Sequence, residues 1–189
     1  LSCTSNINWF INTFDSSINE ITNYLKDSMS SDALMKNSPY YLPYLTGERT
    51  PLNDPHVRAS FHNMGIETDR KTLVFSLIEG ISFGLYDNYQ ALSKTGIELN
   101  NLFVIGGGSK NKDWIELLAS ILDRDLAITE ASDAMAAYGA ARLAYLGYNN
   151  LKHQDVLKSP SVKEIIKKSN NTKSILQDRF VEWKKYYVN

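Results

Sequence analysis

Apolar residues recur every three or four positions in two long stretches of the chain, residues 6–28 and residues 69–94. This spacing puts the apolar side chains on one side of a helix, so each stretch predicts an amphipathic helix with one buried face. The second stretch contains Gly80 and Gly84, four positions apart. We expect the missing side chains to let another backbone approach that helix closely.

A short strand and a long connection separate these two helices. Residues 40–45 (YYLPYL) predict a strand, and Pro43 restricts it to an edge or irregular position, because proline cannot donate a ladder hydrogen bond. The connection over residues 46–67 has no regular pattern except for a short possible strand at 58–61. Connections of this length are uncommon inside a compact domain and are often functional.

From residue 102 onward, strands and helices alternate. The expected elements are a strand at 102–105, a helix at 111–122, a strand at 125–129 and a helix at 132–147. This rhythm predicts an α/β fold. The last of these helices is rich in small residues, which favours close packing against its neighbours, and Ala136 or Ala137 near its start could instead leave room for a planar ring.

Past residue 150 the pattern is helical again, with one apolar stripe that we expect to dock on the rest of the chain. The stripe consists of Leu176, Phe180, Trp183 and Tyr187. The chain is therefore divided into a domain over residues 1–150 and a helical tail over residues 151–189 packed on that domain.

Composition and charge exclude several classes of function. A length of 189 residues with 43% apolar content allows one sizeable domain or two small ones. Twenty basic residues oppose twenty-one acidic ones, and the net charge of −1 gives no general attraction to nucleic acid or to an anionic membrane. No apolar run approaches the ~20 residues that span a bilayer. We expect a cytoplasmic protein without nucleic-acid or membrane partners.

Cysteine and histidine offer little special chemistry. The single cysteine, Cys3, excludes an intrachain disulfide and fits a reducing compartment. His56, His62 and His153 lack the local spacing of a zinc site, so no metal ligand is assigned. The chain begins with Leu1 at the start of a helix, which suggests a piece of a larger protein.

The stretch LFVIGGGSKNKDW (102–114) carries the most specific chemical signal. Consecutive glycines between a strand and a helix leave backbone N–H groups uncovered, which suits a phosphate or the flat face of a base. The alternative is a tight turn without a ligand. A P-loop is excluded because no G-x-x-x-x-G-K-[ST] occurs. A dinucleotide fingerprint fails because position 111 is asparagine where a third glycine is needed.

Several segments in series resemble the carboxyl-terminal domain of the FGGY carbohydrate kinases, most closely the xylulose-phosphorylating branch of that family. They are YLPYLTGERTPLNDPHVR (41–58), LVFSLIEGISFGLYDNYQAL (73–92), LFVIGGGSKNKDWIELLASILD (102–123) and AAYGAARLAYLG (136–147). A lone GGG would be weak, but four such segments in the family's order are specific.

The resemblance implies an α/β, ribonuclease-H-like or actin-like ATPase fold with a mixed sheet flanked by helices. In this family ATP and sugar meet in a cleft between two domains. The implied reaction transfers the γ-phosphoryl group of ATP, with Mg²⁺, to D-xylulose, giving D-xylulose 5-phosphate. In such reactions a carboxylate accepts the proton of the attacking hydroxyl.

The resemblance also implies which residues bind the nucleotide. The triple glycine matches a turn that contacts the adenosine and α-phosphate side, and the asparagine after it matches a polar position that bonds to the nucleotide. The start of the first helix matches, more loosely, a segment that borders the adenine pocket. The residues concerned are Gly106, Gly107, Gly108, Asn111, Asn8 and Trp9.

Part of the family's machinery is not in this sequence. The catalytic aspartate of the family lies in a glycine-rich segment upstream of the first helix, and the sugar pocket comes largely from the amino-terminal domain. We therefore assign no catalytic residue, expect the chain alone to be inactive, and expect the missing amino-terminal domain to be its partner. Formation of a homodimer is left open.

Other functions stay open at this point. One alternative is a kinase for gluconate or another sugar, since GER-x-P loops occur there too. A second is a non-catalytic, actin-like interaction module. A methyltransferase would need an acidic residue at the end of the second strand, which instead ends in Thr129. In the long connection, Glu48, Arg49 and Arg58 favour pairing that pins the loop over contact with substrate.

Overall fold

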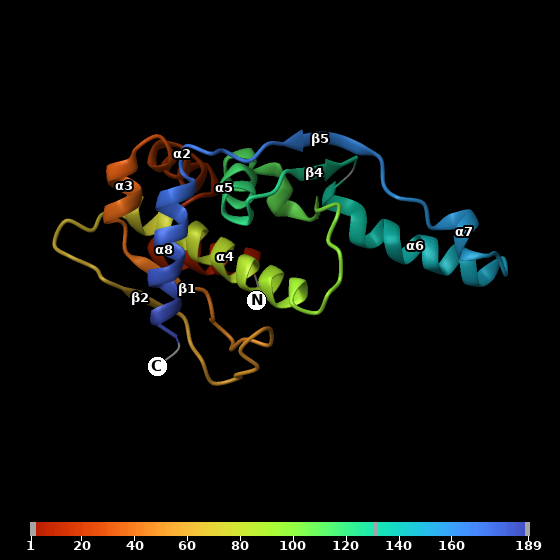
Figure 1. Ribbon diagram of the computed structural model, residues 1–189, viewed down its shortest axis with the longest axis horizontal. Helices are drawn as coiled ribbons and strands as arrows, with labels where there is room; N and C mark the ends of the chain where they lie inside the picture. Colours follow the sequence, from red (N-terminus) through yellow and green to blue (C-terminus); the bar gives the residue numbers. More distant parts are fainter. Residues whose placement is uncertain (1–2, 131, 188–189) are drawn as a thin grey trace.

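The computed structural model describes residues 3–130 and 132–187 (Figure 1). The helices are α1 (Cys3–Phe14), α2 (Ile18–Met29), α3 (Asp32–Asn37), α4 (Arg70–Ser93), α5 (Lys112–Leu122), α6 (Met135–Tyr148), α7 (His153–Val156) and α8 (Lys173–Lys185), with 3₁₀ turns η1 (Gly107–Lys110) and η2 (Ser132–Ala134). The strands are β1 (Tyr40–Leu42), β2 (Ser60–His62), β3 (Phe103–Val104), β4 (Leu126–Thr129) and β5 (Val162–Ile166). No helix among these residues is long and apolar enough to cross a membrane.

The strands form two sheets. β1 and β2 make an antiparallel pair, and β3, β4 and β5 make a mixed sheet in that order, with β3 parallel and β5 antiparallel to β4. α5 covers one face of the mixed sheet, where Ile115, Leu118 and Ala119 pack on Leu126 of β4. The predicted α/β fold with a mixed sheet flanked by helices is confirmed.

The predicted helix over residues 6–28 is wrong, because the chain forms two helices there. Asp15 adopts a left-handed conformation (φ 49°), which ends α1. Ser17 then caps α2, since its side-chain oxygen accepts a hydrogen bond from the Glu20 amide at 3.1 Å. After the break, α2 packs on both α4 and α5, whereas α1 packs on α4.

The central helix α4 agrees with the predicted helix over residues 69–94. The helix begins with a capping box. The Asp69 carboxylate accepts a hydrogen bond from the Thr72 amide at 2.8 Å, and the Thr72 hydroxyl oxygen accepts one from the Asp69 amide at 3.1 Å. Gly80 faces β1, and a Cβ at this position would lie 2.2 Å from the carbonyl oxygen of Tyr41. The predicted close backbone approach is confirmed at Gly80.

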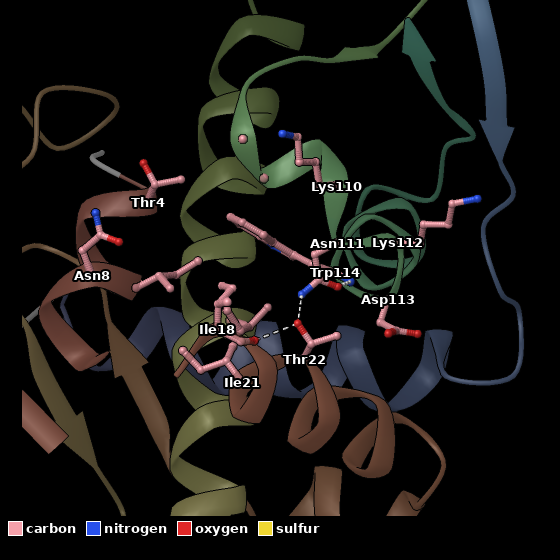
Figure 2. A pocket seen from close by; sticks show the side chains of 14 residues that line it. Thr4, Asn8, Ile18, Ile21, Thr22, Lys110, Asn111, Lys112, Asp113 and Trp114 are labelled. Atoms are coloured by element: carbon pink, nitrogen blue, oxygen red, sulfur yellow. Dashed lines mark hydrogen bonds between the residues drawn. The ribbon is translucent and has the colours of Figure 1, made fainter. Parts of the chain in front are cut away.

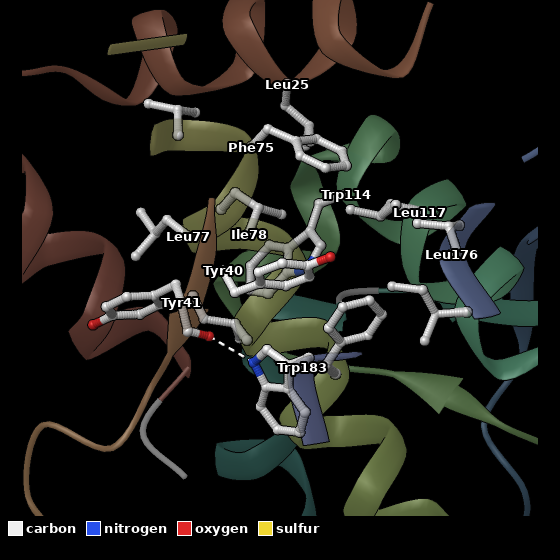
Figure 3. Close-up of a cluster of buried hydrophobic side chains, with 14 of the residues drawn as sticks. Leu25, Tyr40, Tyr41, Phe75, Leu77, Ile78, Trp114, Leu117, Leu176 and Trp183 are labelled. Carbon is white, nitrogen blue, oxygen red and sulfur yellow. Dashed lines mark hydrogen bonds between the residues drawn. The ribbon is translucent and has the colours of Figure 1, made fainter. Parts of the chain in front are cut away.

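The carboxyl-terminal helix α8 packs on α5, α3 and β1, and its side chains also reach α4, where Phe180 meets Phe83 (Figure 3). Within the predicted apolar stripe, Leu176, Phe180 and Trp183 are buried. The Trp183 indole donates to the Tyr41 carbonyl oxygen at 2.7 Å. On the same helix, the buried Arg179 guanidinium donates twice, at 2.6 Å, to the carboxylate of Glu79 on α4. Docking of this stripe is confirmed.

Two expectations about the second half of the chain are wrong. Residues 162–166, expected to be helical, form β5 and pair with β4, which sequence periodicity could not reveal because the pairing is distant along the chain. The small-residue helix α6 does not pack closely on neighbours: it has no buried residue within the described chain and extends away from the body of the molecule (Figure 1). Nothing lies within 4 Å of a Cβ placed at Gly139 or Gly147.

Candidate nucleotide-binding site

The glycine turn follows β3 directly and leads through η1 into α5. Gly106 has φ 90° and ψ 178°, a backbone conformation that is essentially confined to glycine. Its amide donates to the Ser132 carbonyl oxygen at 2.7 Å, which ties this turn to the turn after β4. Glycine is therefore needed at position 106 because other residues rarely adopt this backbone conformation.

The next two glycines differ in what surrounds them, and only Gly108 is needed for space within the protein. A Cβ at Gly108 would lie 2.8 Å from the Trp114 ring, so this glycine lets the indole lie against the turn. The indole is buried, and its N–H donates to the Ser82 hydroxyl of α4 at 3.0 Å. At Gly107 a Cβ would meet nothing within 4 Å. Among the described residues the amides of Gly107 and Gly108 donate no hydrogen bond.

Asn111 links the turn to two helices. Its side-chain oxygen accepts from the Trp114 amide at 3.1 Å and so caps α5, while its Nδ2 donates to the Thr22 hydroxyl of α2 at 3.2 Å. The residue predicted to bond to the nucleotide thus already makes hydrogen bonds to the protein through both the oxygen and the nitrogen of its amide group. The cap explains why the helix begins where the glycine turn ends.

A cavity of about 520 Å³ opens beside the turn, between α1, α2, α4 and α5 (Figure 2). We call it the turn cavity. Its walls are mostly isoleucine and the Trp114 ring, with amide, hydroxyl and charged groups around them. It is lined by Thr4, Ile7, Asn8, Ile18, Ile21, Thr22, Ile78, Gly107, Gly108, Lys110, Asn111, Lys112, Asp113 and Trp114. The size is that of an ordinary small-molecule site.

A second cavity, of about 610 Å³, lies on the other side of the turn, next to β3. We call it the sheet-edge cavity. Its lining is largely apolar and comes from Cys3, Thr4, Ser5, Leu85, Tyr89, Leu102, Phe103, Val104, Ile105, Gly106, Gly107, Gly108, Trp114, Ile115, Leu118, Leu122 and Leu126. The glycine turn and the Trp114 ring border both cavities, so they form the partition between them.

The structure brings most of the predicted residues together. Gly107, Gly108, Asn111 and Asn8 line the turn cavity, although Asn8 is far from the others in the sequence. Gly106 lines only the sheet-edge cavity. These positions come from α1, η1 and the start of α5, which explains how segments about 100 residues apart form one site.

Trp9 is not part of either cavity, although it was expected beside the nucleotide. Its ring stacks on Tyr41 at a centroid distance of 6.2 Å and meets the edge of Phe14 at 6.0 Å. It therefore packs on a different face of α1 from Asn8, because adjacent helix residues point about 100° apart. The structure assigns Trp9 a packing role.

Sequence reasoning missed the contribution of α2. Ile18, Ile21 and Thr22 line the turn cavity, and they reach it because α1 ends at Asp15 and the chain folds back. The usable signal was Ser17 with Glu20 three positions later, a spacing typical of a helix start. A second capped helix placed beside the glycine turn could have been expected from it.

The charged groups at the rim are paired with the neighbouring sheet. The Lys110 ammonium lies 2.8 Å from Asp133, and its hydrogen bond holds the pKa of that carboxyl below the ordinary value. Lys112 lies 2.8 Å from Glu164 of β5. Among the described residues no group of three or more His, Cys, Asp or Glu side chains could hold a metal ion. Lys110 and Lys112 at the rim of the turn cavity thus already have carboxylate partners within the protein.

The long connection is held by hydrogen bonds between its charged side chains and its own backbone. The Glu48 carboxylate accepts from the amides of Arg49 (2.9 Å) and Thr50 (3.1 Å), and the Glu48 backbone pairs with Asp54. The Arg58 guanidinium donates to two carbonyl oxygens of the same loop. These bonds support the expectation that the charged residues pin the loop.

Comparisons with known proteins agree with this geometry. Residues 1–148 match the model of the FGGY family of carbohydrate kinases, C-terminal domain. The xylulose kinase of Staphylococcus xylosus is 32% identical over 169 residues, which is 88% of this chain and 34% of that protein. The chain thus spans about a third of the length of this relative.

Solved structures show the same fold. A xylulose kinase from Brucella ovis superposes with a TM-score of 0.83 and 29% identity over 97% of this chain and 37% of its own. A Plasmodium falciparum glycerol kinase solved with ADP gives a TM-score of 0.77 at 23% identity, over 98% of this chain and 36% of its own. The predicted actin-like kinase fold is confirmed. The chain belongs to the FGGY family of carbohydrate kinases and corresponds to the carboxyl-terminal domain of that family.

Proposed function

We propose that this chain is the nucleotide-binding part of an ATP-dependent sugar kinase that phosphorylates D-xylulose to D-xylulose 5-phosphate. The observation that carries the proposal is the turn cavity, whose edge is formed by the two bare amides of Gly107 and Gly108. The choice of sugar is supported by the Staphylococcus xylosus relative, a xylulose kinase, and by the GERTP and YGAARLA segments.

Adenine fits the chemistry of the turn cavity. Its flat ring would lie against the apolar walls formed by Ile7, Ile21 and Trp114, and its polar edge would face Asn111 or Asn8. The sugar and α-phosphate would then run over Gly107, where the absence of a side chain leaves the amides accessible. Lys110 and Lys112 are already paired with carboxylates of the protein, so backbone N–H groups would supply the hydrogen-bond donors for the phosphate.

The remaining parts of the reaction would come from elsewhere. Mg²⁺ would arrive bound to the phosphate oxygens of ATP. The carboxylate that accepts the hydroxyl proton and most of the sugar pocket would come from an amino-terminal domain. We therefore propose that this chain binds ATP but does not transfer its phosphoryl group alone.

An uncovered apolar surface supports an amino-terminal partner. Within the described chain β3 has one strand neighbour, β4, so its other edge is free beside the sheet-edge cavity. Phe103 of β3 and Ile105, which follows that strand, are exposed, and α6 exposes Tyr138, Leu143, Tyr145 and Tyr148. Exposed apolar side chains and a free strand edge are typical of surfaces that another part of the protein covers.

Titration calorimetry with ATP tests the proposed site in the 189-residue chain. Gly107→Leu should weaken ATP binding at least tenfold while leaving the melting temperature unchanged, because the added side chain meets no protein atom but fills the mouth of the cavity. Gly139→Leu on α6 is the matched control, also free of contacts, and should bind ATP like the unaltered chain.

Two outcomes would contradict the proposed nucleotide site. One is the absence of ATP binding by a folded, unaltered chain. The other is equal ATP affinity in Gly107→Leu, which would place the nucleotide elsewhere. ADP production from ATP and D-xylulose by the chain alone would contradict the proposed division of the machinery.

A further inference from the structure

Three hydrogen bonds in a row determine how Asn111 presents its amide group to the turn cavity (Figure 2). The Thr22 hydroxyl donates to the carbonyl oxygen of Ile18 at 2.9 Å. The Asn111 Nδ2 donates to the Thr22 oxygen at 3.2 Å, and the Asn111 Oδ1 accepts from the Trp114 amide at 3.1 Å. We call this series the Thr22 relay.

The Thr22 relay allows only one orientation of the amide. A backbone N–H can only donate, so the atom facing the Trp114 amide must be the Asn111 oxygen. The proton of the Thr22 hydroxyl is used by the Ile18 carbonyl, so the Thr22 oxygen can only accept, and the atom facing it must be the Asn111 nitrogen. Both ends of the side chain give the same answer, and exchanging O and N would break both bonds.

Counting donors and acceptors shows what Asn111 has left for a ligand. A carboxamide has two N–H donors and two oxygen lone pairs. One donor goes to Thr22 and one lone pair to the Trp114 amide, so one donor and one lone pair remain on a residue that lines the cavity.

This pair of groups distinguishes purines by the substituent at position 6. Adenine offers an acceptor at N7 and a donor at its 6-amino group, which match an asparagine amide bidentately. A 6-oxopurine offers N7 and O6, two acceptors, and O6 would face the remaining lone pair of the amide. We propose that Thr22, through this relay, is a positioning residue that makes the turn cavity selective for 6-aminopurine over 6-oxopurine nucleotides. This inference rests on the proposed nucleotide site.

Nucleotide selectivity in variants of Thr22 tests the inference. Calorimetry on the 189-residue chain would give the affinity ratio for ATP over ITP, which differ only at position 6 of the purine. We expect a ratio of about tenfold or more in the unaltered chain, by the discrimination typical of a bidentate pair. In Thr22→Val, which keeps the shape and removes the hydroxyl, the amide can pivot about its bond to Trp114, and the ratio should fall about fivefold.

Thr22→Ser is the matched control, because it restores the hydroxyl and should restore the ratio. A merely structural role for Thr22 would change the melting temperature or both affinities together, and would leave the ratio unchanged. Thr22→Ala serves as the second hydroxyl-free variant if Thr22→Val does not fold.

The outcomes separate this inference from the proposed function. If the unaltered chain binds ATP and the folded hydroxyl-free variant keeps its ATP-to-ITP ratio, the relay is wrong and the nucleotide site stands. A ratio near one in the unaltered chain also overturns the relay alone. If the folded, unaltered chain binds neither nucleotide, the proposed function fails, and the relay fails with it.

Discussion

Gly80 and Gly107 show how different the reasons for a glycine can be at the scale of single residues. At Gly80 the helix α4 touches the backbone of β1, and a methyl group would lie 2.2 Å from the Tyr41 carbonyl oxygen. At Gly107 the space is empty in the protein and is bordered by the turn cavity. The first glycine therefore serves packing, and we propose that the second serves a ligand.

Gly80→Ala should lower the free energy of unfolding by about 3 kcal/mol, the upper range for overpacking, because the obstacle is rigid backbone. Gly139→Ala, in a helix with open space around it, should raise it by about 0.5–1 kcal/mol through the better helix propensity of alanine. Urea denaturation followed by circular dichroism measures both. Equal effects of the two substitutions would show that α4 and β1 can move apart.

At the scale of elements, α8 is held on α4 by a buried ion pair. The side chains of Arg179 and Glu79 are 4% and 1% exposed, and Arg179 also donates to the carbonyl oxygens of Ser38 and Pro39. Burial raises the pKa of Glu79, against the opposing effect of Arg179. Removing either partner would leave the other charge unpaired in the core, which is more costly than losing the pair itself.

We expect Arg179→Met and Glu79→Gln each to destabilise the fold by about 3–5 kcal/mol. The double variant should be less destabilised than the sum of the two, since no lone charge remains buried. Lys112→Met, which breaks an ion pair with side chains 64% and 37% exposed, is the control and should cost less than about 1 kcal/mol. Additive effects of Arg179→Met and Glu79→Gln in denaturant melts would contradict this coupling.

Elements with a strong local signal could be predicted from the sequence, and those set by distant contacts could not. Helix α5 and the glycine turn follow from local periodicity and composition, whereas the role of Asn111 as the cap of that helix became visible only in the structure. The break at Asp15 was missed because the left-handed residue there is not a glycine. The pairing of β5 with β4 was missed because it depends on residues more than 30 positions apart. Asn8 was assigned to the site by the family resemblance. Thr22 could not be assigned without knowing that the first helix ends at Asp15 and that a second helix follows.

At the scale of the whole molecule, the apolar surface is unevenly distributed. The body formed by α1–α5 and α8 encloses a core of buried side chains, whereas α6 projects from it with no buried residue in the described chain (Figure 1). Three large apolar side chains on α6, Tyr138, Leu143 and Tyr145, are each more than half exposed. An amino-terminal domain over this side would cover them, as proposed above.

The isolated chain should therefore bind the dye ANS and tend to self-associate. Leu143→Glu combined with Tyr145→Glu should at least halve ANS fluorescence and shift size-exclusion elution toward the monomer. The melting temperature should stay unchanged, because α6 contributes no buried residue. Val181→Glu alters an apolar side chain that is 62% exposed on α8 and should change neither measurement. A monomeric chain that binds no dye would contradict the exposed surface.

The position of Trp114 has one practical consequence. Its ring borders both cavities, whereas Trp183 lies in the core and Trp9 packs on Tyr41. Of the three tryptophans in the sequence, Trp114 alone lines the two cavities and would respond to a ligand in either of them. The protein thus carries its own optical reporter, and the emission of a Trp9→Phe, Trp183→Phe chain would follow occupancy without any added label.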